Sequence, residues 1–155
     1  VKEGNNLQAR EAMAFADTLA GMSLSEAGAA LPHPLGESIG SIYKDIPHGR
    51  TMAVIYPEFM RFSAINAVEK FAKVGHLLNP RLATVPDQIA SVKMCNEFDN
   101  FLKKINMWYS LQDLGIDLQR LEGLPAMLAQ FTVHFTPRPA NEEDIKTILK
   151  KANKR

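Results

Sequence analysis

Two of the four histidines lie in one proline- and glycine-rich stretch, residues 28–57. A proline directly precedes both His33 and His48, and the stretch also holds four of the nine glycines. Because proline fixes φ and is favoured in the first turn of a helix, we expect both imidazoles near helix starts. Free N–H groups and the helix dipole point outward there, which suits an anion or a metal-bound oxygen. The stretch is therefore the first candidate for chemistry.

The same histidines also have a simpler interpretation as local hydrogen-bonding partners. Asp45 precedes His48 at i, i+3, and Glu37 follows His33 at i, i+4, which are spacings at which helical side chains meet. A catalytic zinc-type site needs three protein ligands and an open position. No HExxH, CxxC, GxGxxG or GxxxxGK[ST] pattern occurs in the chain. Residue types and spacing thus leave a metal site and a structural pair both open.

Helical periodicity dominates the elements that must position these side chains, and strand-like alternation is essentially absent. Strong helix formers fill Leu7–Ala20, with Gly21 as the expected stop. Residues 48–56 are apolar all round after the first turn, which predicts a helix in the middle of a bundle, closed by Pro57. Asn141 is the expected cap of a last helix that begins with acids and ends with lysines. The sequence predicts an all-α helical bundle of about seven helices.

Composition describes an ordinary globular chain of one domain. Its 155 residues are 46% hydrophobic and 23% charged, and this length is enough to bury a sizeable core. The net charge of +1 offers no electrostatic case for nucleic acid as a partner. The sequence shows no signal peptide and no apolar run long enough for a membrane span, so we expect no membrane partner.

The remaining reactive side chains are interpreted as structural. Cys95 is the single cysteine, which excludes an internal disulfide and is typical of a reducing cytoplasm, the expected location. Its helical, apolar context predicts a buried core residue rather than a nucleophile. His76, near an expected helix end, is predicted to lie at the surface or to cap the dipole. His134 has no partner nearby in sequence and is assigned a structural or surface role.

Two stretches carry a resemblance to a known family. The run AREAMAFADTLAGMSLSEAGAALPHPLGESIGSIYKDIPHGRTMAVIYPEFMRF resembles the helical domain of the iron-containing (group III) alcohol dehydrogenases. The family pattern has a helix ending in AG, an apolar stretch with a ligand histidine, then an HG with a second ligand histidine before an apolar helix closed by proline. The tail TPRPANEEDIKTILKKA resembles the family's closing segment. The resemblance covers roughly the first 75 and last 25 residues.

The resemblance implies that His33 and His48 are metal ligands. Many members carry another histidine, lining the nicotinamide pocket, four residues after the first ligand. Glu37 stands at that position here, where the family usually has histidine, and is the candidate catalytic residue. In the other register His33 takes the pocket position and the ligand position falls on Ala29. That register needs several inserted residues before His48, whereas the first needs about one, so the first is preferred.

Other parts of the family pattern are missing. The family's further ligands, an aspartate and a histidine one helical turn apart, lie upstream of the first histidine, and no DxxxH precedes His33 here. The nucleotide-binding domain would lie further upstream still. The chain begins at Val1 rather than methionine. The expectation is that residues 1–155 form one helical domain, a fragment that carries half a metal site.

The implied parent is a metal-dependent, nicotinamide-dependent alcohol dehydrogenase. It would interconvert a small alcohol and an aldehyde or ketone by hydride transfer, with Fe(II) or Zn(II) as Lewis acid. NAD or NADP would be bound mainly by the absent domain, the parent would be a homo-oligomer, and this fragment alone would be inactive. The alternative is a stand-alone helical interaction domain without catalysis, whose histidines are structural.

Overall fold

Seven α-helices and four short 3-10 helices make up the computed structural model, which describes residues 3–130 and 136–155. No strand occurs in these residues, so the all-α prediction is confirmed. None of the described helices is long and apolar enough to cross a membrane. The α-helices are α1 (Leu7–Ala27), α2 (Pro32–Ile42), α3 (His48–Ser63), α4 (Val68–Leu78), α5 (Asp87–Lys104), α6 (Leu124–Ala129) and α7 (Glu142–Ala152). The 3-10 helices are η1 (Ala64–Asn66), η2 (Pro80–Thr84), η3 (Gln112–Leu114) and η4 (Leu118–Leu121).

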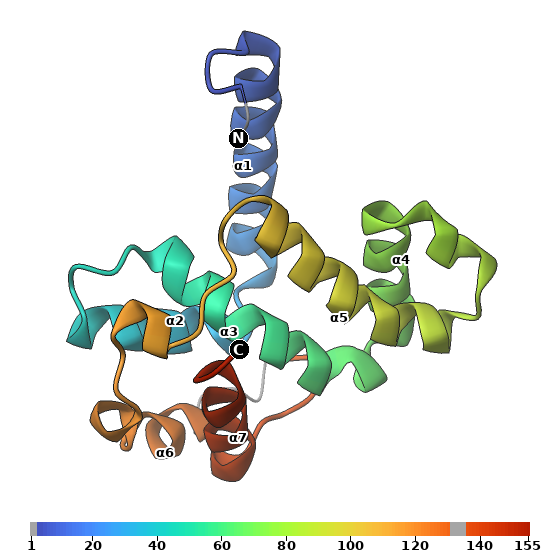
Figure 1. Ribbon diagram of the computed structural model, residues 1–155. Coiled ribbons are helices and arrows are strands. Elements are labelled where there is room, and N and C mark those ends of the chain that lie inside the picture. The colour runs from blue at the N-terminus through green and yellow to red at the C-terminus, as the bar shows by residue number, and fades with distance from the viewer. Residues whose placement is uncertain (1–2, 131–135) are drawn as a thin grey trace.

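Helix α3 is the centre of the fold. It contacts α2, α5 and α7, and Figure 1 shows it running between them. Val54 and Ile55 are fully buried and Phe59 is almost so, and all three belong to the main hydrophobic core. The prediction of a central, buried helix is confirmed, and the first residue of that helix is His48.

The predicted end of this helix at Pro57 is wrong. Pro57 lies inside α3, which continues to Ser63. A proline inside a helix removes one backbone hydrogen bond. The helix continues because the buried side chains on both sides of the proline, Ile55 and Phe59, pack into the same core and stabilise the helical backbone there.

The predicted stop of α1 at Gly21 is also wrong. The helix continues to Ala27 and ends at Gly28, where φ is 70° and the backbone N–H donates to the Leu24 carbonyl. Gly28 has a positive φ, which glycine adopts at little steric cost, whereas Gly21 stays in the helix. No residue of α1 is buried, and Figure 1 shows the helix rising away from the others.

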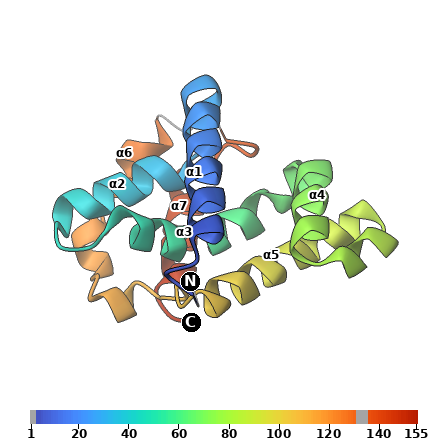
Figure 2. The ribbon, with the colours of Figure 1, turned by 90° about the horizontal axis from the view of Figure 1, so that it is seen from above.

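Helices α4 and α5 form a hairpin on one side of α3, opposite α2 and α6 (Figure 2). Gly75 allows their close approach, because a Cβ there would lie 3.1 Å from the Met94 Cβ and 3.2 Å from the Ala90 carbonyl oxygen. Cys95 is buried in this hairpin, as predicted, and burial raises the pKa of its thiol. A buried, protonated thiol is a core side chain rather than a nucleophile.

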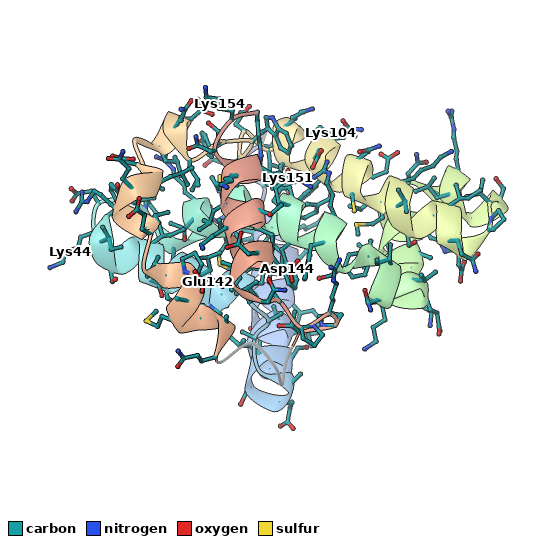
Figure 3. The ribbon with its side chains drawn as sticks, turned by 90° about the horizontal axis from the view of Figure 1, so that it is seen from below. Lys44, Lys104, Glu142, Asp144, Lys151 and Lys154 are labelled. Atoms are coloured by element: carbon teal, nitrogen blue, oxygen red, sulfur yellow. The ribbon has the colours of Figure 1, made fainter. Side chains whose placement is uncertain are left out.

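Helix α7 covers α3 from another side. Asn141 and Asp144 form a capping box, which confirms the predicted start of the last helix. Figure 3 shows Glu142 and Asp144 at one end of α7 and Lys151 and Lys154 at the other. This charge order suits the helix dipole. Packing of α7 on α3 stabilises the helix that carries His48.

Candidate metal centre

The two histidines of interest lie at the starts of neighbouring helices. His33 is the second residue of α2, directly after Pro32, and His48 is the first residue of α3, directly after Pro47. The prediction that both imidazoles sit near helix N-termini is confirmed. Helices α2 and α3 contact each other, which brings the two N-terminal turns into one place.

The two imidazole rings are in contact. Their centroids lie 4.8 Å apart and the ring planes make an angle of 82°. Two imidazole nitrogens bound about 2.0–2.1 Å from one tetrahedral ion would place the ring centroids roughly 5 Å apart. The spacing of His33 and His48 therefore fits two ligands of a single metal ion.

Glu37 contacts the first of these histidines. Its Oε1 lies 3.2 Å from His33 Nε2, with 30% of the histidine side chain and 62% of the glutamate side chain exposed. The local i, i+4 pair considered from the sequence is thus present. Within residues 3–130 and 136–155, no group of three or more His, Cys, Asp and Glu side chains could hold a metal ion. The donors present fit part of a metal centre, namely two imidazoles with a carboxylate on one of them.

A buried hydroxyl lies beneath the histidine pair. Thr51 is fully buried, and its Oγ1 lies 2.8 Å from the His48 carbonyl oxygen and 3.2 Å from the Gly36 carbonyl oxygen. The second contact joins α3 to α2. Sequence reasoning missed Thr51, because a threonine inside an apolar helix carries no signal that its hydroxyl reaches a neighbouring helix.

The other two histidines do not join this pair. His76 lies in the last turn of α4, near a helix end as predicted. Its Nε2 is buried and has no hydrogen-bond partner among the described residues, so this nitrogen neither lies at the surface nor caps the helix, contrary to the prediction from the sequence. His134 lies outside the described residues.

The family model for the C-terminal part of the Fe-containing alcohol dehydrogenase family matches residues 1–153. The chain belongs to this family. The resemblance noted in the sequence is confirmed, and it extends through the middle of the chain as well as its two ends.

Individual relatives agree with this membership. The chain is 32% identical over 150 residues to a 1,3-propanediol dehydrogenase of Klebsiella pneumoniae, covering 96% of this chain and 38% of that protein. It is 27% identical over 153 residues to an NAD-dependent methanol dehydrogenase of Bacillus methanolicus, covering 98% of this chain and 40% of that protein. The chain therefore spans well under half the length of these family members.

The fold matches as well. The crystal structure of a 1,3-propanediol oxidoreductase superposes with a TM-score of 0.88 at 32% identity, covering 96% of this chain and 39% of that one. The helical fold of this chain is thus shared with that oxidoreductase.

Proposed function

We propose that this chain is the helical, metal-binding part of a nicotinamide-dependent alcohol dehydrogenase that interconverts a small alcohol and an aldehyde or ketone. Family membership supports the reaction class. The contact between the His33 and His48 rings at the starts of α2 and α3 is the observation that carries the assignment of the site.

In this proposal, His33 and His48 hold Fe(II) or Zn(II), since imidazole suits both metals. The metal, when bound, supplies Lewis-acid polarisation of the alcohol oxygen. Glu37 keeps the His33 ring in one orientation through its contact with Nε2, which leaves Nδ1 as the nitrogen that would bind the metal, as in ligand histidines held by a carboxylate. We therefore assign Glu37 to positioning rather than to proton transfer.

The chain spans 38–40% of its relatives, and we propose that the rest of such an enzyme supplies the other ligands and the NAD or NADP site. Dinucleotide pyrophosphates are bound by glycine-rich βα units, and the described part of this chain has no strand. The single free thiol is in keeping with a reducing compartment such as the cytoplasm.

The metal proposal is tested by calorimetric titration of the chain with zinc and with iron(II). We expect weak binding, because two histidines leave the coordination sphere unfilled. Replacement of either histidine, His33→Ala or His48→Ala, should abolish the heat of binding. His76→Ala is the matched control and should leave it unchanged.

Two results of this titration would contradict the assignment. Nanomolar, stoichiometric binding would mean that further ligands complete the site within this chain. Unchanged binding in His33→Ala together with loss in His48→Ala would favour the other register, in which the ligand position falls on Ala29 and His33 faces the nicotinamide pocket.

We also propose that the protein is a homo-oligomer, because α1 leaves large apolar side chains in water. Met13, Phe15 and Met22 are each more than 60% exposed, and such surface usually finds a partner. Light scattering at tens of micromolar should show assemblies larger than one chain. The double variant Phe15→Ser/Met22→Ser should dissociate them, while Glu11→Gln on the same helix should not. A clean monomer of the unsubstituted chain would refute this proposal.

A stand-alone interaction domain without catalysis is the second candidate. The unburied helix α1 and the lack of a third ligand in the described residues favour it. This candidate predicts association without any metal binding. Light scattering and the zinc titration on the same sample therefore separate the two functions.

A further inference from the structure

We infer that Gly36 and Thr51 are positioning residues that together set the separation of the His33 and His48 rings. This inference rests on the proposed function for its chemical consequence, because the ring pair is the proposed metal-binding unit. The geometry itself does not depend on that function. The inference concerns residues one turn below the imidazoles, which do not themselves contact the ion.

Gly36 allows the start of α2 to approach the start of α3. A Cβ built at this residue would lie 2.9 Å from Met52 Sδ, 3.0 Å from Thr51 Oγ1 and 3.5 Å from His48 Cε1. Met52 has a flexible side chain whose end can move away. Thr51 is β-branched, fully buried and hydrogen-bonded, so it cannot move away without loss. A methyl group at Gly36 would therefore push α2 and α3 apart at the level of the His48 ring.

Thr51 connects the same two points with a hydrogen bond. Its hydroxyl has one hydrogen, which the carbonyls of His48 and Gly36 share, at 2.8 and 3.2 Å. The bond to the Gly36 carbonyl joins α3 to α2 at a residue that has no side chain. The bond to His48 joins the threonine to the backbone of the ligand residue. Loss of the buried Thr51 hydroxyl would remove both of these hydrogen bonds, which costs free energy and ends the link between the helices.

Gly36 and Thr51 therefore set the distance between α2 and α3 together. The absent side chain at Gly36 permits the close approach, and the Thr51 hydroxyl holds it. His33 stands one turn before Gly36 on α2, and His48 stands one turn before Thr51 on α3. A change in the distance between Gly36 and Thr51 therefore changes the distance between the His33 and His48 rings.

The test is proton NMR of the metal-free chain, followed by zinc titration of the same samples. The unsubstituted chain should show cross-relaxation between ring protons of His33 and His48, because the rings are in edge-to-face contact. Gly36→Ala and Thr51→Val should each weaken or abolish this signal. They should also lower zinc affinity by about 10–100-fold, the usual effect of losing a residue that supports a ligand.

Three control variants separate positioning from general loss of stability. Gly40→Ala changes a glycine one turn later on α2, where a Cβ meets nothing within 4 Å, and should keep the ring signal. Gly75→Ala strains the α4–α5 hairpin and should lower the melting temperature without changing the ring signal. Thr51→Ser restores the hydroxyl and should recover the signal that Thr51→Val loses. Circular dichroism confirms that each variant is folded.

The outcomes distinguish the inference from the function on which it rests. An unchanged ring signal in folded Gly36→Ala and Thr51→Val would overturn the positioning role. A lost ring signal with unchanged zinc affinity would uphold the positioning role and refute the assignment of the pair as ligands. The expected result is that Gly36→Ala and Thr51→Val each lose the ring signal and zinc affinity, whereas Gly40→Ala keeps the ring signal and the zinc affinity.

Discussion

His48→Ala should remove the metal from an enzyme assembled around this domain and slow its turnover by about a thousandfold or more. The enzyme for this experiment is a chimera that joins the chain to the remaining part of the Klebsiella pneumoniae relative. The match to the C-terminal segment of that relative covers 96% of this chain. Lewis-acid stabilisation is worth several kcal/mol, and each 1.36 kcal/mol is tenfold in rate. Metal content and steady-state kinetics on a primary alcohol are measured together.

Affinity for the nicotinamide cofactor should survive this substitution. Dinucleotide binding comes from a glycine-rich βα unit and its helix N-terminus, which lie in the other part of the chimera. Glu37→Gln should be much milder than His48→Ala, because its amide can still contact His33. The unsubstituted chimera and His76→Ala are the controls. If His33→Ala kept metal and rate while Glu37→Gln lost both, the assignment of His33 as the ligand would be wrong.

Arg61→Ala should be among the most destabilising single substitutions outside the apolar core. Arg61 on α3 is paired with Asp99 on α5, and the aspartate is only 8% exposed. Burial lowers the pKa of the Arg61 guanidinium, but the hydrogen bond and charge of Asp99, together with the charge of Glu58, leave that pKa raised, so the guanidinium keeps its charge. Removal of the arginine would leave a buried carboxylate whose Oδ1 already lacks a partner among the described residues.

The expected loss is about 3 kcal/mol, the lower end of the range for breaking a buried ion pair, because 32% of the Arg61 side chain is exposed. In a chain of this size that lowers the melting temperature by roughly 6–12 °C. Lys73→Ala, which breaks the exposed ion pair with Glu69, should leave the melting temperature unchanged. The double variant Arg61→Met/Asp99→Leu should regain most of the loss. If Arg61→Ala melted like Lys73→Ala, the buried pair would contribute nothing to stability.

Part of the fold, namely several helix starts, could be predicted from neighbouring residues in the sequence. Prolines before His33 and His48 indicated helix starts, and the Asn141 capping box indicated the start of the last helix. These signals act within one turn, so neighbouring residues suffice to determine them. Family membership could be inferred as well, because the histidine, glycine and proline pattern occurs in a fixed order along the chain.

Helix ends were predicted less well, for a reason that is also physical. Gly21 and Pro57 are intrinsic helix breakers, yet both lie inside helices. A glycine interrupts a helix only weakly unless its backbone leaves the helical region, as that of Gly28 does with its positive φ. For Pro57, burial of Ile55 and Phe59 in one core outweighs the lost hydrogen bond. Burial depends on residues distant in sequence, and local propensity does not report it.

The sequence by itself determined that His33 and His48 stand at helix starts, and its resemblance to the family made them candidate ligands. Only the tertiary structure decided that the rings of His33 and His48 touch, that the Glu37 carboxylate contacts one of them, and that the Thr51 hydroxyl joins the two helices beneath. The physical reason is that the distance between two helix starts depends on how side chains interlock across the whole contact. At this contact the decisive feature is the missing side chain of Gly36, whose effect depends on what the opposite helix places against it.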